Sequence, residues 1–189
     1  MKHILMMLAL VFSLSADAQS AETLYKQGKA LYDAKNYQEA FPKLKVAAEK
    51  GHKKAQYRLG RCYDKGNGTT ENDAEAFKWY MKSAAQDYAK ALYQVGMCYK
   101  DGEGTTKDRQ KAVQYFTKAA KLDNADAQYQ LGKAYLKGKG IEPDEKKARS
   151  WLKKAVSNPK GGDEVLAKIK KDAATGDEDD KHILSLVTK

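Results

Sequence analysis

A block of 36 residues recurs three times along the chain, and this repetition constrains the fold more than any other feature. The segment Ala55–Gly60 (AQYRLG) recurs as Ala91–Gly96 (ALYQVG) and as Ala127–Gly132 (AQYQLG). After each copy come a tyrosine, two closely spaced glycines, an Asn or Asp, and an alanine followed three residues later by an aromatic residue. Self-similarity at this length is the signature of repeat architectures, in which stacked units bury one continuous core.

The spacing of apolar residues within each unit predicts a pair of helices. Ala55, Leu59 and Tyr63 lie four residues apart, which places them on one face of a first helix. The two glycines that follow favour a left-handed turn that ends this helix. An Asn or Asp then stands where its side chain can accept a hydrogen bond from an unpaired N–H of the second helix. These capping positions are Asn72, Asp108 and Asp144.

The pattern weakens at both ends of the repeated region. Tyr25 and Gly28 match Tyr57 and Gly60 upstream, but this first copy lacks the glycine turn, so it is a divergent unit. Beyond residue 160 the repeat gives way to shorter apolar patterns, and we expect a helical cap that covers the end of the last unit. The acidic run 177–180 stands at the expected start of the final helix, where negative charge is favoured. A calcium site is the alternative for this run, but EF-hand spacing is absent.

The first residues resemble a secretory signal. Lys2 and His3 precede an apolar stretch, Ile4–Leu14, and Ala16–Ala18 forms an A-x-A cleavage site. The stretch is too short to span a bilayer, and no cysteine follows it as a lipoprotein anchor would require. We therefore expect an exported protein, periplasmic or secreted, with no membrane insertion after cleavage. A buried N-terminal helix is the alternative.

The expected organisation is a signal peptide at 1–18, a divergent repeat at 19–51, repeats at 52–87, 88–123 and 124–160, and a cap at 161–189.

The composition is that of a soluble repeat protein with a basic surface. The chain is 42% hydrophobic and 32% charged, with a formal net charge of +10. Nearly all of its 35 basic residues are lysines. Because arginine rather than lysine reads phosphates and bases through paired hydrogen bonds, this excess favours a solvated surface, and we expect no nucleic-acid partner.

The two cysteines occupy the same position in neighbouring units. Cys62 and Cys98 are 36 residues apart. Packed helices lie about 8–10 Å apart, which exceeds the roughly 7 Å limit between the Cα atoms of a disulfide. We predict two buried free thiols that pack as small apolar groups.

The combined pattern A-x-x-x-[LV]-G-x-x-Y, G-x-G, [ND] and A-x-x-[WY] resembles the Sel-one-like repeat (SLR) family, a branch of the tetratricopeptide superfamily. Residues 52–157 carry the resemblance, although Thr69 and Thr105 replace the Val that is usual after the second glycine. It implies an all-α, right-handed solenoid of about four helix-turn-helix repeats, with the first helices lining the concave face. It also implies an adaptor function. Cysteine-rich members associated with β-lactam binding carry cysteine pairs within each unit, which this chain lacks.

The concave face is the candidate binding surface that the resemblance implies. One tyrosine position recurs in all four first helices, where its amphipathic side chains could form a ladder. The alternative is that these tyrosines pack between units. The tetratricopeptide carboxylate clamp uses Asn at this position, which argues against that particular ligand class. The predicted binding residues are Tyr25, Tyr57, Tyr93, Tyr129, Lys29, Lys54, Lys90, Arg61 and Lys133.

No catalytic or metal-binding motif is present in the sequence. His52 and His182 are isolated, and no H-E-x-x-H, C-x-x-C or G-x-S-x-G occurs. The paired glycines are repeat turns, not nucleotide fingerprints, because no strand precedes them. We therefore expect no enzyme, no catalytic residue, no cofactor and no metal.

Three classes of function remain open. The leading hypothesis is an adaptor that binds a protein or peptide, and the basic groove residues suggest an acidic ligand. The second is a module that binds an envelope polymer such as peptidoglycan or an acidic polysaccharide. The third, least favoured by the sequence, is a β-lactamase-like or cell-wall hydrolase.

Overall fold

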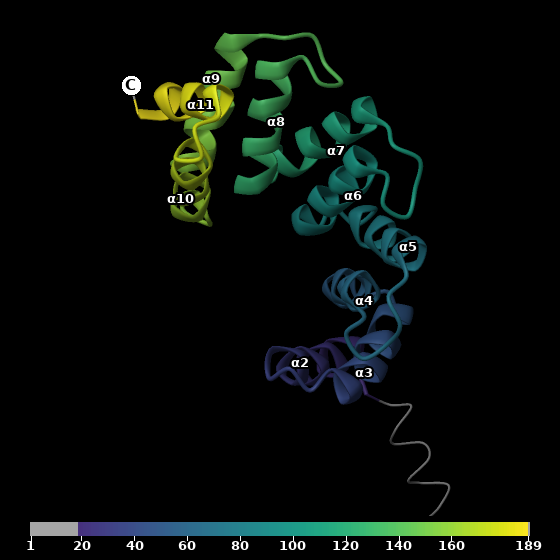
Figure 1. Ribbon diagram of the computed structural model, residues 1–189. Helices are drawn as coiled ribbons and strands as arrows, with labels where there is room; N and C mark the ends of the chain where they lie inside the picture. The colour runs from purple at the N-terminus through teal and green to yellow at the C-terminus, as the bar shows by residue number, and fades with distance from the viewer. Residues whose placement is uncertain (1–18, 189) are drawn as a thin grey trace, which may run out of the picture. The chain divides into compact units, whose positions relative to one another are not determined.

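The computed structural model describes residues 19–188, and within that range the chain forms ten α-helices and no strand (Figure 1). This confirms the predicted all-α repeat solenoid. The right-handed twist expected for the solenoid stays a prediction. The predicted signal peptide lies outside the described residues.

The chain divides into two compact units between Glu71 and Asn72. Unit 1 contains α2 (Ala21–Asp33), α3 (Tyr37–Glu49) and α4 (Lys53–Lys65). Unit 2 contains α5 (Asp73–Ala84), α6 (Ala89–Asp101), α7 (Arg109–Lys121), α8 (Ala125–Lys137), α9 (Glu145–Val156), α10 (Gly162–Ala173) and α11 (Glu178–Thr188).

Unit 1 is built from the helix pair α2–α3, with α4 packed mainly on α3. Its buried positions follow the helical period of the sequence: Leu24 comes from α2, Leu44 from α3 and Leu59 from α4. The turn between α2 and α3 is short and places Lys35 at a positive φ of 62°. Unit 1 therefore closes its first hairpin without the glycine loop that the later repeats use.

The helix ends confirm the predicted caps. Asn72, Asp108 and Asp144 each accept a hydrogen bond from the backbone N–H three residues on, at the start of α5, α7 and α9. These bonds satisfy donors that a helix start leaves unpaired. The first helices end on left-handed glycines, as the turn chemistry predicts. They are Gly66, Gly102 and Gly138, with φ of 64°, 86° and 61°.

Unit 2 stacks the helix pairs α6–α7 and α8–α9, and α5 packs against α6. Phe116 and Leu152 occupy the same repeat position and are buried. Each lies directly over a glycine of its partner helix. A Cβ added at Gly96 would lie 2.6 Å from the Phe116 ring, and one at Gly132 would lie 2.7 Å from Leu152 Cγ. The repeated glycine therefore sets how closely the two helices of a hairpin approach.

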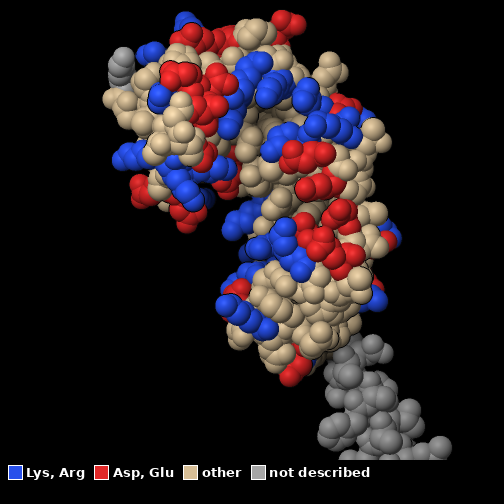
Figure 2. All heavy atoms as spheres, viewed as in Figure 1, with Lys and Arg blue, Asp and Glu red and all other residues tan. Residues whose placement is uncertain are grey.

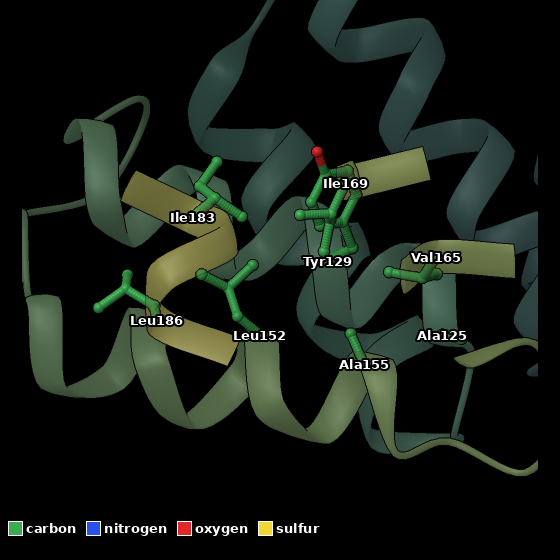
Figure 3. Packing of buried hydrophobic residues seen from close by; sticks show 8 residues of the cluster. All are labelled: Ala125, Tyr129, Leu152, Ala155, Val165, Ile169, Ile183 and Leu186. Atoms are coloured by element: carbon green, nitrogen blue, oxygen red, sulfur yellow. The ribbon is translucent and has the colours of Figure 1, made fainter. Parts of the chain in front are cut away.

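The last two helices cover the end of the α8–α9 pair, as the sequence predicts for a terminal cap (Figure 3). Val165 and Ile169 of α10 and Ile183 and Leu186 of α11 are all buried. They form one apolar cluster with residues of α8 and α9, which would otherwise face solvent. The α8 and α9 members of the cluster are Ala125, Tyr129, Leu152 and Ala155.

Cys62 and Cys98 are both buried free thiols, as predicted. Burial raises the pKa of Cys62 to about 12, so its thiol stays protonated and packs as an apolar group. Within residues 19–188, none of the helices is both long and apolar enough to cross a membrane.

Candidate functional site

Unit 2 contains a pocket of about 430 Å³, which lies within the size range of ligand-binding pockets. Helices α6, α7 and α8 form its walls, the loops after α6 and α8 contribute to its edge, and α10 contributes one side chain, Lys168.

We call the apolar side chains that line the pocket its floor; among them Tyr93 and Met97 are half-buried and the others are buried. Tyr93 and Met97, one helical turn apart on α6, face Val113 and Phe116 of α7. The centroids of the Tyr93 and Phe116 rings lie 6.0 Å apart, with an angle of 39° between the ring planes. Ala134 of α8 lines the same space. The repeat pattern places these residues here because they continue the buried faces of the helix pairs to the open side of the pocket.

The edge of the pocket is strongly basic. Asp101 is the single acidic residue among its lining side chains. Figure 2 shows a band of basic side chains next to the acidic side chains over α11. The seven cationic lining residues are Lys100, Lys107, Arg109, Lys133, Lys137, Lys139 and Lys168.

Loop packing brings two of these cations together. Gly140, in the loop after α8, lies on the backbone carbonyl of Arg109, the first residue of α7. A Cβ at Gly140 would lie 2.3 Å from that carbonyl oxygen, and the φ of 80° is unfavourable for other residues. The preceding residue, Lys139, is therefore held near the start of α7. Clustered cations of this kind attract anions.

Only three of the seven cations have a carboxylate within 4 Å among residues 19–188. Lys100 Nζ lies 3.3 Å from Asp101, and Lys137 Nζ lies 2.6 Å from Asp179. Lys133 Nζ lies 4.0 Å from Asp180. The cations without such a partner are Lys107, Arg109, Lys139 and Lys168.

The Tyr129 ring makes cation–π contacts with two of the pocket lysines. The ammonium groups of Lys133 and Lys168 lie 5.2 Å and 5.4 Å from the centroid of its ring, within the range of cation–π attraction. Burial lowers the pKa of Lys133, and the nearby charges of Lys137 and Lys168 lower it further, against the opposing effect of Asp180. The hydrogen bond to Asp179 raises the pKa of Lys137. Lys133 is therefore a desolvated cation whose charge a bound carboxylate would stabilise.

Several aromatic and basic residues of unit 1 are paired within that unit. Tyr25 is stacked on the His52 ring at 4.4 Å, and His52 Nε2 lies 2.8 Å from a Glu22 carboxylate oxygen. Arg58 lies 3.0 Å from Asp33, which also accepts a hydrogen bond from Lys29. The basic groups of this region are thus partly neutralised by carboxylates of the same unit.

The structure separates the predicted binding residues into distinct groups. Tyr93 and Lys133 line the pocket. Tyr129 and Tyr25 are buried: cap helices cover Tyr129, and the His52 ring is stacked on Tyr25. This burial favours the packing alternative for these two tyrosines, and their binding role stays a prediction. The remaining predicted residues do not line the pocket, and their binding role stays a prediction. Tyr57 and Arg61 are half-buried, and Lys29, Lys54 and Lys90 are exposed.

Several pocket residues lie in loops or on second helices, outside the first helices to which the sequence prediction assigned the binding surface. The loop positions carry a detectable signal, a reversal of charge between neighbouring repeats. Lys107 and Arg109 stand where the preceding repeat has Glu71 and Asp73, and Lys139 stands where it has Glu103. Two residues on helices carry the same signal, because Lys100 stands where the preceding repeat has Asp64 and Lys137 stands where it has Asp101. The last of the pocket cations, the cap residue Lys168, carries no such signal. It lies outside the repeats, so only folding brings it to the pocket.

The chemistry of the pocket is suited to binding. Its lining contains no Ser, Thr, Cys or His side chain that could act as a nucleophile with a base. Within residues 19–188, no group of three or more His, Cys, Asp or Glu side chains is arranged to hold a metal ion. Cations around an apolar floor can hold a ligand that combines negative charge with apolar groups.

Comparison with protein families gives a clear assignment. The Sel1 repeat model matches residues 53–88, 89–124 and 125–159, which is more than half of the chain. The chain belongs to the Sel1 repeat family. Sel1 repeat proteins are generally non-catalytic scaffolds that mediate protein interactions. No curated protein matches this Sel1 repeat chain at a significant level.

Solved structures of other Sel1 repeat proteins are similar to this one. A Sel1 repeat protein from Oxalobacter formigenes is 28% identical with a TM-score of 0.69, and the match covers 85% of this chain and 74% of that one. The protective antigen c5321 of uropathogenic Escherichia coli, which has an SLR fold, is 27% identical with a TM-score of 0.73. That match covers 91% of this chain but only 42% of c5321. A Sel1 repeat protein from Klebsiella pneumoniae, 23% identical over 82% of this chain and 79% of that one, shares the fold at a TM-score of 0.54.

Proposed function

We propose that this chain is an exported adaptor whose pocket in unit 2 binds an acidic segment of a protein partner. The observation that carries the proposal is the group of four cations without a carboxylate within 4 Å, placed around an apolar floor. Bringing like charges together is unfavourable unless counter-charges are supplied. Acidic side chains of a partner would supply them.

The apolar floor favours a peptide over a polymer that is only charged. Tyr93 and Met97, which are half-buried, present an aromatic and a thioether group, which contribute to binding mainly when an apolar side chain covers them. A protein segment that alternates carboxylates with apolar residues can use both the floor and the basic edge. An acidic polysaccharide can use only the edge, so its binding should weaken steeply with salt.

Export is supported by the first residues of the sequence. Lys2, the apolar stretch Ile4–Leu14 and the A-x-A site at Ala16–Ala18 together match a cleavable signal. Mass spectrometry of the protein recovered from the envelope or medium of the producing cell would test it. A mature chain that begins at Gln19 supports export, and a cytoplasmic chain that retains Met1 contradicts it.

The pocket can be tested by giving its loops the charges of the preceding repeats. The variant Lys107→Glu/Arg109→Asp/Lys139→Glu uses residues that this chain already carries at equivalent positions, so the fold should persist. The probe is a short fluorescent peptide in which glutamates alternate with leucines, measured by fluorescence anisotropy. We expect its affinity to fall by about tenfold or more, because several charge pairs of up to 1 kcal/mol each are replaced by repulsion.

The matched control is Lys45→Glu/Lys146→Glu/Lys160→Glu. It changes the net charge by the same amount, but at exposed lysines that do not line the pocket. Circular dichroism should give equal helical content for both variants. Equal loss of affinity in both would mean that net charge and not the pocket governs binding. Binding of polygalacturonate but not of the peptide would favour the envelope-polymer function instead.

A further inference from the structure

The first turn of α11 places acidic side chains against two lysines of the pocket. Asp179 lies 2.6 Å from Lys137 Nζ, and Asp180 lies 4.0 Å from Lys133 Nζ. Both lysines line the pocket. Asp177 accepts a hydrogen bond from the backbone N–H of Asp180 and so orders this turn. We call residues 177–180 the acidic turn.

The acidic turn is held in place by the packing of its helix. Ile183 and Leu186 of α11 are buried in the apolar cluster that joins the cap to α8 and α9 (Figure 3). Ile183 is one helical turn beyond Asp179. Because this burial anchors α11, the position of the turn does not depend on its ion pairs alone, and the carboxylates remain close to the pocket when those pairs break.

The ion pairs themselves are weak enough to exchange. The Asp179 side chain is 63% exposed, and exposed ion pairs contribute little to stability. Lys133 is held more loosely, at the outer limit of an ion-pair distance. An incoming carboxylate can therefore compete with Asp179 for Lys137 and with Asp180 for Lys133.

We infer that the acidic turn is a built-in competitor for the pocket, occupying Lys133 and Lys137 with the same carboxylate chemistry that the partner supplies. This inference rests on the proposed function. In the free protein a ligand meets four cations that have no carboxylate within 4 Å, namely Lys107, Arg109, Lys139 and Lys168, although Asp179 acts electrostatically on Lys139 and Asp126 on Lys168. A partner with more acidic groups displaces the acidic turn and gains Lys133 and Lys137 as well. The turn thereby selects for highly acidic segments and weakens the binding of sparsely charged ones.

Removing the competing carboxylates tests the inference. Asp179→Asn/Asp180→Asn keeps the size of both side chains and leaves the cap residue Asp177 unchanged. We expect the glutamate–leucine peptide to bind about three- to tenfold more tightly, since two weak pairs no longer have to be broken. The control Glu145→Gln/Asp163→Asn also neutralises two exposed carboxylates in the first turns of helices, away from the pocket lining. It should change affinity less than twofold.

A second measurement does not depend on the variants. Carbodiimide cross-linking of the wild-type protein should join Lys137 to Asp179, and mass spectrometry can quantify the link. Added peptide should reduce this link as peptide–Lys137 links appear. An undiminished internal link while the peptide cross-links to Lys107 or Lys139 would overturn the inference.

The results separate this inference from the proposed function. If the wild type binds the peptide and the pocket reversal weakens it, but Asp179→Asn/Asp180→Asn binds no more tightly, only the competitor role fails. If neither the wild type nor Asp179→Asn/Asp180→Asn binds the peptide, the proposed function fails with it.

Discussion

Unit 1 and unit 2 both carry tyrosine and basic side chains, but they pair their charges differently. In unit 1, Asp33 contacts both Arg58 and Lys29, and Glu22 contacts His52. In unit 2, four cations at one pocket have no carboxylate within 4 Å among the described residues. The comparison shows that the conserved packing pattern of a repeat leaves its binding chemistry open, because that chemistry depends on the positions that vary between repeats.

The largest effect expected from a single substitution comes from giving the pocket of unit 2 a further carboxylate. Gln130 lines the pocket among the cations, so Gln130→Glu would pair with them as Asp33 does in unit 1. We expect the affinity for the glutamate–leucine peptide to fall by about three- to tenfold, because the new carboxylate occupies cations and repels the ligand. Fluorescence anisotropy measures the change.

The control for this change is Gln114→Glu, at an exposed position of α7 that does not line the pocket. Its affinity should stay within about twofold of the wild type, because exposed charges away from the site are screened. Unchanged affinity in Gln130→Glu would show that the unpaired cations of unit 2 do not determine binding.

The reverse change frees the cations of unit 1. Asp33→Asn removes the carboxylate that Arg58 and Lys29 share. It is best made in a chain whose pocket already carries Lys107→Glu/Arg109→Asp/Lys139→Glu, so that binding in unit 2 is suppressed. We expect a partial recovery of peptide affinity, about twofold to threefold, since unit 1 then presents unpaired cations without a comparable apolar floor. No recovery would mean that free cations alone do not create a site.

The smallest expected effect is a dependence of unit 1 stability on pH. The hydrogen bond from Lys29, with the charge of Arg58, lowers the pKa of Asp33 below its ordinary value of 3.8. The stabilisation is therefore present above pH 3.8 and is lost as the pH falls through the lower folded-state pKa. Because Asp33 is half-exposed, we expect less than about 1 kcal/mol.

Urea unfolding of the wild type and Asp33→Asn at a series of pH values would measure this contribution. The difference in free energy of unfolding should be largest near neutral pH and should vanish in strong acid. A difference that persists unchanged in acid would assign the effect of Asp33 to packing and not to its charge.

The fold was predictable from the sequence because the same apolar, capping and glycine positions recur in successive repeats. The stripe that contains Leu59, the capping residues and the left-handed glycines depend on local chemistry within one turn or one helix. The absence of a disulfide between Cys62 and Cys98 was predictable because the two cysteines occupy the same position in neighbouring repeats, too far apart to bond. The binding residues were less predictable, because Tyr93 and Tyr129 are equivalent in sequence but differ in accessibility: the first lines the pocket and the second lies under the cap.

By itself the sequence determined the helix pairs, their ends, their stacking in register and the presence of a terminal cap, since these features depend on periodicity and local hydrogen bonding. Only the tertiary structure decided which cations meet at one pocket, which of them find a carboxylate, and that the acidic turn of α11 lies against Lys133 and Lys137. Pairing of charges depends on distances of a few ångströms between elements far apart in the chain, and a one-dimensional pattern carries no such distances.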